Sequence, residues 1–280
     1  MALNVASSIG IVITNKWLMD VYLFKFGTLL TMIHFIVTFL GLELCARRGM
    51  FEKKKIALSA VLPLCWSFCG FVVLTNISLV YNSMAKVLTT PCIVVIQTMH
   101  YKMTFSTPVK AALAVTCLGV VIASVTDFQL NLTGTIFALA GVLVTSFYQI
   151  WVGTKQKDLG VNSMQLLYYQ APISALMLVP CIPILDDLRA LFKYDWSTQV
   201  ISFIFLSACL AFFVNISIFL VIGKTSVVTY NVLGHFKLCL IIGLGFVIFG
   251  YPVDVRNLLG IFVTLAGVFW YSDIQLRSKR

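Results

Sequence analysis

The sequence predicts an all-α integral membrane protein of about ten transmembrane helices, arranged as two inverted five-helix repeats. Of the 280 residues, 60% are hydrophobic and 11% are charged, whereas soluble domains carry about 25% charged residues. The apolar residues gather in runs of roughly 20, the length of a membrane-spanning helix. Basic residues concentrate in the short connections between these runs. Together these features exclude a water-soluble globule and favour a multi-pass membrane protein.

Each predicted span follows one apolar run, and most connections between the runs are very short. The longest connections are Arg47–Lys55 and Asp186–Ser197, so we expect one integral membrane domain without a soluble domain. The first span begins at Met1 and is expected to double as the insertion signal. In chain order the predicted spans are Ala2–Leu18, Phe26–Ala46, Ile56–Leu79, Met84–Tyr101, Val109–Thr126, Thr133–Thr154, Ser163–Leu185, Thr198–Ile222, Ser226–Phe249 and Val255–Asp273.

Loop charges predict the orientation of the chain. Most of the basic residues outside the spans fall on one side of the membrane, and the other side holds only Lys25, Arg189, Lys193 and Arg256. The positive-inside rule places the more basic side in the cytosol, together with both termini. The basic side holds Arg47, Arg48, Lys53, Lys54, Lys55, Lys102, Lys110, Lys155, Lys157, Lys224, Arg277, Lys279 and Arg280.

A weak internal repeat relates residues 1–127 to residues 132–276. The fifth span contains Thr116-Cys117-Leu118-Gly119, and the tenth contains Thr264-Leu265-Ala266-Gly267. A proline precedes each of these spans, at Pro108 and Pro252. Because five is odd, two halves of five spans have opposite orientations. Inverted repeats of this kind are a common transporter plan, with the solute site near the bilayer midplane.

Two lysines inside apolar runs, Lys86 and Lys237, are the first candidates for a binding site. A charge at membrane depth costs about 2.5–3.5 kcal/mol on insertion scales and persists where it faces a cavity or a partner. Lys86 precedes Thr89, Thr90 and Pro91, and the proline is expected to kink the helix beside a cavity. The alternative for Lys86 is a side chain that extends to the nearby interface.

Lys237 lies near the middle of the ninth predicted span, where no interface is close. At helical spacing Tyr230, Gly234 and Lys237 share a face, and Asn231 adds a hydrogen-bonding amide. Since no predicted span has an acidic residue near its centre, the expected counter-charge is an anionic solute. His235 falls on another face, where a hydrogen bond to a neighbouring helix is the expected role.

Further candidates for the substrate site are Lys16, Tyr148 and Tyr169. Lys16 ends the first span, where an interfacial anchor is the alternative to a ligand contact. Tyr148 and Tyr169 could stack on a base or sugar. Both lie deeper in their spans than Trp151, and the position of Trp151 suits an interfacial aromatic belt. Residues 147–151 and 168–170 also offer amide groups.

Several function classes lack their signatures. We find no Gly-rich phosphate loop, no HExxH, no GxSxG and no carboxylate pair within a span, so an enzyme is not expected. The eight cysteines lie in or beside apolar runs without a metal-binding spacing, so we expect neither a disulfide framework, nor a metal, nor a cofactor. The net charge of +10 resides in loops and is explained by orientation rather than by nucleic-acid binding.

The chain resembles the nucleotide-sugar and triose-phosphate translocator family of the drug/metabolite transporter superfamily, in particular solute carrier family 35, subgroup E. The resemblance covers almost the whole chain. It is most specific in Val152–Lys157, Val161–Pro172 and Thr225–Lys237. It implies a ten-helix exchanger of Golgi, endoplasmic reticulum or plastid membranes. It also implies that Lys86 and Lys237 occupy positions that bind substrate phosphate, and Asn15-Lys16 matches an asparagine–lysine pair in the first helix of the family.

The chain departs from the family pattern at two places. Leu238 stands where phosphate-carrying relatives have an arginine, which argues against triose phosphate as substrate. The connection between Leu79 and Lys86 is also shorter than in relatives, and it is the reason a non-transporting interaction protein stays an alternative.

The leading hypothesis is an antiporter of the Golgi or endoplasmic reticulum membrane that exchanges a nucleotide sugar for a nucleoside monophosphate. A carrier of a smaller organic phosphate is the second alternative. The sugar, the base and the formation of a homodimer are left open by the sequence.

Overall fold

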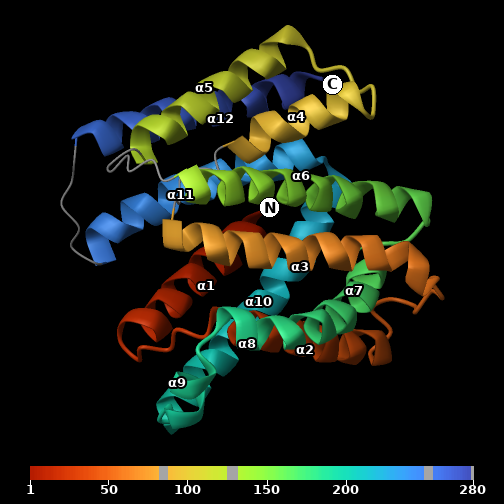
Figure 1. The fold of residues 1–280 in the computed structure, drawn as a ribbon. Coiled ribbons are helices and arrows are strands. Elements are labelled where there is room, and N and C mark those ends of the chain that lie inside the picture. Colours follow the sequence, from red (N-terminus) through yellow and green to blue (C-terminus); the bar gives the residue numbers. More distant parts are fainter. Residues whose placement is uncertain (82–87, 125–131, 249–254, 279–280) are drawn as a thin grey trace. The chain divides into compact units, whose positions relative to one another are not determined.

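The computed structural model describes residues 1–81, 88–124, 132–248 and 255–278, and these residues form helices and connections without a strand (Figure 1). Lys86, a predicted site residue, lies outside the described residues. The helices are α1 (Ala2–Asp20), α2 (Gly27–Arg47), α3 (Leu58–Tyr81), α4 (Thr89–Met99), α5 (Thr107–Ser124), α6 (Leu132–Asp158), α7 (Ser163–Leu178), α8 (Ile182–Leu185), α9 (Leu188–Lys193), α10 (Thr198–Lys224), α11 (Val227–Ile248) and α12 (Val255–Arg277).

The described helices follow the predicted spans, with two differences. The seventh span consists of α7, a 3₁₀ turn at Val179–Cys181 and α8, with a proline near the start of both short elements. Proline removes a backbone donor and interrupts regular hydrogen bonding. The predicted connection Asp186–Ser197 contains the short helix α9, because the carboxylate of Asp187 accepts hydrogen bonds from the first backbone N–H groups of that helix.

Within the described residues, six helical segments are long and apolar enough to span a membrane. Helices α3, α4 and α5 add shorter apolar segments. The predicted all-α, multi-pass membrane protein is therefore confirmed at this level, and the count of ten spans stays a prediction. The six segments are Gly27–Arg47, Ile136–Asp158, Ser163–Leu185, Thr198–Lys224, Val227–Leu244 and Val255–Arg277.

Four buried hydroxyl groups inside the apolar helices are satisfied locally. Thr38, Thr116, Ser146 and Thr264 each donate to the carbonyl oxygen four residues earlier, at 2.7–2.8 Å. An unsatisfied polar group costs several kcal/mol in hydrocarbon. These side chains can therefore be buried without a partner on another helix.

The chain divides into two compact units. The first contains residues 1–77 and 151–225, and the second contains residues 78–150 and 226–280. Each unit combines helices from both predicted repeats, 1–127 and 132–276. Compactness and sequence symmetry are different properties, so this division does not test the predicted repeats.

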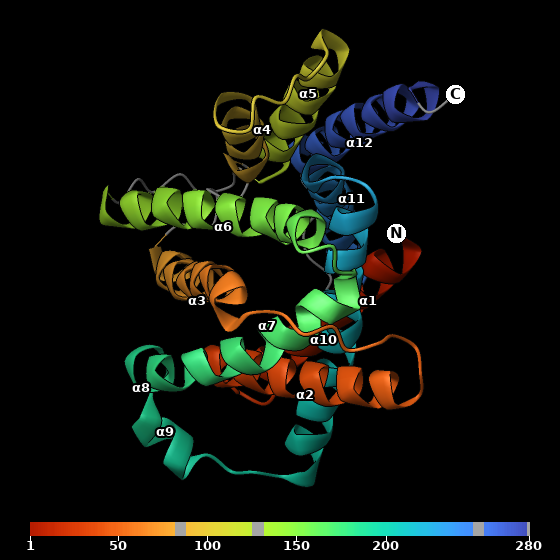
Figure 2. The ribbon, with the colours of Figure 1, turned by 90° about the vertical axis from the view of Figure 1, so that its right-hand side faces the viewer.

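In the first unit, α2 packs against α7 and α10, and α1 packs against α10 (Figure 2). An apolar cluster at one end joins Leu18, Phe24, Phe26, Leu30, Val200 and Ile204. The buried carboxylate of Asp186 accepts hydrogen bonds from the backbone N–H groups of Thr28 and Leu29, at 3.1 and 2.8 Å. Asp186 thereby caps the N-terminus of α2, where a negative charge is favoured by the helix dipole.

In the second unit, α5 runs along α12, and small residues let the two backbones meet (Figure 1). A Cβ added to Gly119 would lie 2.3 Å from the backbone nitrogen of Thr264, and one added to Gly267 would lie 2.4 Å from Thr116 Oγ1. The Thr-x-x-Gly segments of the predicted repeat therefore contact each other reciprocally. Helix α11 packs against α4, α5 and α12 in the same unit.

Candidate substrate site on α11

The start of α11 is fixed by hydroxyl groups. Ser226 Oγ accepts a hydrogen bond from the backbone N–H of Thr229 at 3.1 Å, which caps the helix. Thr229 Oγ1 in turn lies 2.9 Å from Tyr271 Oη on α12. The first turn of α11 is thus held in place just before the predicted site residues.

Lys237 is buried on α11, with 8% of its surface exposed. Its Nζ lies 5.2 Å from the centre of the Tyr230 ring, two turns earlier on the same helix. A cation at this distance over an aromatic face is stabilised by the ring quadrupole. Because α11 contains no Asp or Glu, the helix brings a positive charge into the apolar layer without a carboxylate of its own.

Gly234 separates these groups and opens the surface between them. At 100° per residue, it lies between Tyr230 and Lys237 on one side and Asn231 on the other. Among the residues that the structure describes, no heavy atom lies within 4 Å of a Cβ added to Gly234. We call Tyr230, Asn231, Gly234 and Lys237 the α11 stripe.

The amide of Asn231 joins the stripe to α6. Its Nδ2 donates to Gln149 Oε1 at 2.6 Å and to the backbone oxygen of Val227 at 2.9 Å. Gln149 was not among the predicted site residues, since nothing in the spacing of residues 149 and 231 indicates that they meet.

His235 makes the helix–helix hydrogen bond expected of it. Its Nε2 lies 2.8 Å from Thr90 Oγ1 on α4, and both residues are buried. This confirms the expectation that His235 contacts another helix, and at 100° per residue it lies about 160° around α11 from Lys237. The bond fixes the start of α4, which begins shortly after the position of Lys86.

The predicted site residues that the structure describes fall in both units. Tyr230, Asn231 and Lys237 form the stripe, and Tyr148 is buried on α6 in the same unit. Lys16 on α1 and Tyr169 on α7 are half-buried and belong to the first unit. The roles of all these residues in substrate binding stay predictions.

Comparison with known proteins decides the family. The profile of the Triose-phosphate Transporter family matches residues 3–272. The chain belongs to the Triose-phosphate Transporter family. This membership confirms the resemblance stated above and places the chain in the drug/metabolite transporter superfamily.

Relatives that this family member resembles in sequence include two Arabidopsis thaliana proteins. The chain is 41% identical to UDP-xylose transporter 3, over 97% of this chain and 78% of the relative. It is 34% identical to UDP-rhamnose/UDP-galactose transporter 1, over 97% of this chain and 81% of the relative. Both are named as transporters, in agreement with the prediction that the chain is a membrane transporter rather than an enzyme.

A solved crystal structure shares the fold of this family member. It aligns with a TM-score of 0.77 over 99% of this chain and 96% of that chain, at 12% identity. At this identity the comparison concerns the fold alone.

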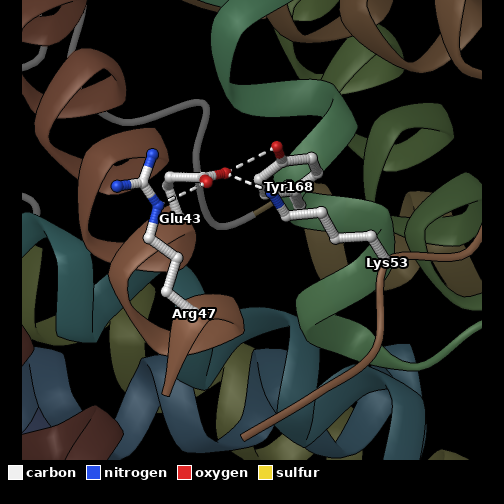
Figure 3. Close-up of polar contacts among 4 residues, drawn as sticks. All are labelled: Glu43, Arg47, Lys53 and Tyr168. Carbon is white, nitrogen blue, oxygen red and sulfur yellow. Dashed lines mark hydrogen bonds and ion pairs between the residues drawn. The ribbon is translucent and has the colours of Figure 1, made fainter. Parts of the chain in front are cut away.

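A charged cluster at one end of α2 in this transporter was not found by sequence analysis (Figure 3). Glu43 accepts hydrogen bonds from Arg47 Nε at 3.0 Å, Lys53 Nζ at 2.6 Å and Tyr168 Oη at 2.8 Å. The hydrogen bond to Glu43 raises the pKa of Lys53 above its ordinary value. These contacts join α2, α7 and the connection before α3, over separations of up to 125 residues.

Three further hydrogen bonds hold the connection between α2 and α3 across the start of α7. Gln165 Nε2 donates to the backbone oxygen of Glu52 at 2.7 Å, and Lys54 Nζ donates to the backbone oxygens of Leu159 and Gly160. We call Glu52–Lys54, together with Glu43 and Tyr168, the α2–α7 tie.

Glu43→Gln is expected to loosen the α2–α7 tie without unfolding the protein. The neutral amide cannot form an ion pair with the ammonium of Lys53. Its hydrogen bond to Lys53 is therefore weaker than that of the carboxylate, because hydrogen bonds between charged groups are the stronger ones. Tryptic cleavage after Lys53, Lys54 or Lys55, followed by mass spectrometry, should become several-fold faster than in the wild type. Asp273→Asn removes a comparable ion pair with Arg277 on α12 and should leave this cleavage unchanged. Equal rates for Glu43→Gln and the wild type would show that Glu43 does not restrain the connection.

Proposed function

We propose that this transporter is an antiporter that exchanges a nucleotide sugar for a nucleoside monophosphate. The observation that carries the proposal is the buried Lys237, which lies over Tyr230 beside an open position at Gly234. An ammonium in this setting favours an anionic ligand. The two relatives described above are named for UDP-sugars, which supports a nucleotide sugar as the anion.

We further propose a ten-helix fold of two inverted repeats, 1–127 and 132–276. Helices of equal rank in the two repeats pack in pairs: α2 with α7, α4 with α11, and α5 with α12. A two-fold axis relating the halves would produce such pairs, since helices near the axis meet their own equivalents. The reciprocal contacts of Gly119 with Thr264 and of Gly267 with Thr116 fit the same axis.

The repeats suggest a mechanism of alternating access, in which gates on either side open in turn around one midplane site. Moving a buried charge through the bilayer core is costly. A bound phosphate neutralises Lys237, so the loaded carrier would reorient more readily than the empty one. This charge compensation gives a physical reason for obligatory exchange. The basic loops support cytosolic termini, and the location that we propose is the Golgi or endoplasmic reticulum membrane.

Uptake into liposomes tests the proposal. The purified chain is reconstituted with UMP inside or with no nucleotide inside, and labelled UDP-xylose, UDP-galactose and a small sugar phosphate are offered outside. We expect uptake of a UDP-sugar that requires internal UMP. Equal uptake by empty liposomes would refute exchange, and uptake of the sugar phosphate alone would favour a carrier of smaller organic phosphates.

Gly234→Leu is expected to block exchange while the protein still folds. The added side chain enters the open space between Asn231 and Lys237 and takes up room that the substrate needs. Gly243→Leu is a matched control, because a Cβ at Gly243 likewise meets no described residue within 4 Å and lies about 180° around the same helix from Gly234. Exchange rates in liposomes and melting temperatures in detergent check both variants. Full activity of Gly234→Leu would show that the α11 stripe does not line the transport path.

A further inference from the structure

The orientation of two amides beside the stripe can be derived from one backbone group. The carbonyl oxygen of Val227 can only accept a hydrogen bond, so the atom of Asn231 that lies 2.9 Å from it must be the donor Nδ2. The same Nδ2 lies 2.6 Å from one atom of the Gln149 amide, which must then be the acceptor Oε1. The backbone therefore fixes which way both amides point, although amide oxygen and nitrogen are otherwise difficult to distinguish.

This orientation leaves one acceptor and one donor for a ligand. Asn231 Oδ1 and Gln149 Nε2 form no further hydrogen bond with any residue that the structure describes. Both residues are half-buried, so neither atom is sealed inside the protein. The two amides are bonded to each other, and they belong to the same unit. We call this acceptor, Asn231 Oδ1, and this donor, Gln149 Nε2, the edge.

The separation between this edge and the charge of Lys237 suits a nucleotide. Asn231 precedes Lys237 by six residues, which corresponds to about 9 Å along a helix. Gly234, where a Cβ would meet nothing within 4 Å, lies between them. A nucleotide has the same layout, with a base edge at one end, a phosphate at the other and a sugar between.

We propose that Gln149 and Asn231 read the uracil ring of the transported nucleotide. The N3–H of uracil would donate to Asn231 Oδ1, and uracil O4 would accept from Gln149 Nε2. This inference rests on the proposed function, because it requires a nucleotide whose phosphate lies toward Lys237. Gln149 is the new element, a specificity-determining residue that holds the amide of Asn231 and contacts the base itself.

Competition binding on the purified full-length chain tests this inference. Labelled UMP is displaced by unlabelled UMP or by ribose 5-phosphate, which carries the same sugar phosphate without a base. In Gln149→Leu the preference for UMP over ribose 5-phosphate should fall about tenfold, as expected for the loss of one hydrogen bond together with the misorientation of Asn231. Gln97→Leu on α4 changes a buried glutamine of the same unit and should leave this preference unchanged.

A second measurement uses the wild-type protein and so does not depend on how the variants fold. N3-methyl-UMP lacks the N3–H and should bind about tenfold more weakly than UMP. An unchanged preference in Gln149→Leu, or equal binding of UMP and N3-methyl-UMP, would overturn the reading of uracil while leaving nucleotide transport intact. Absence of UMP binding to the wild type would instead refute the proposed function, and the inference with it.

Discussion

Lys237→Met is expected to reduce exchange of UDP-sugar for UMP by about a hundredfold, because removing one partner of a buried charge pair costs 2–5 kcal/mol or more. Methionine keeps the unbranched apolar stem of the lysine side chain but lacks its charged nitrogen. Burial of an ammonium is itself unfavourable, so the variant should fold at least as stably as the wild type. The phosphate then loses its counter-charge in the apolar layer.

Initial exchange rates in liposomes, together with melting temperatures in detergent, measure this effect. Lys237→Arg keeps a charge and should retain more activity than Lys237→Met. Lys224→Met, at an exposed position at the end of α10, is the control for charge removal and should leave exchange unchanged. A fully active Lys237→Met would mean that Lys237 has a structural role and that the phosphate binds elsewhere.

Gly119→Ala and Gly267→Ala are each expected to destabilise the protein by about 1–3 kcal/mol, the usual cost of overpacking a close contact. Each new Cβ would lie within 2.6 Å of a backbone nitrogen on the facing helix, which a side-chain rotation cannot relieve. Helices α5 and α12 must therefore separate. Gly243→Ala, in open space on α11, is the control.

The two losses should also be similar in size if a two-fold axis relates α5 and α12. Chemical denaturation in detergent gives the free energy of unfolding for each variant. Wild-type stability in both variants would contradict the close approach of the two backbones. A large loss in only one of them would argue against the symmetry of the contact.

The features that sequence reasoning predicted here are local or periodic. Runs of apolar residues set the helices, because hydrocarbon leaves few other ways to satisfy the backbone. Helical spacing placed Tyr230, Gly234 and Lys237 on one face and turned His235 toward another helix, and the structure has both. The two Thr-x-x-Gly segments were recognised as a repeat, but only the structure reveals that they contact each other.

Contacts between residues that are far apart in sequence could not be predicted from periodicity. Tyr168 meets Glu43 across 125 residues, and no spacing rule relates them. The cap of α2 by Asp186 and the pairing of Gln149 with Asn231 have the same character. In each case a polar group is satisfied by a helix distant in sequence, and its partner is determined by packing rather than by periodicity.

Photolabelling tests most directly the central claim that the α11 stripe binds the nucleotide. The wild-type chain would be irradiated with 5-azido-UMP, with and without excess UMP, and the labelled peptides would be identified by mass spectrometry. We expect label on α11 near Asn231 or on α6 near Gln149, and we expect UMP to suppress it. The contradicting result would be label on other helices that UMP suppresses, together with no label on α11 or α6.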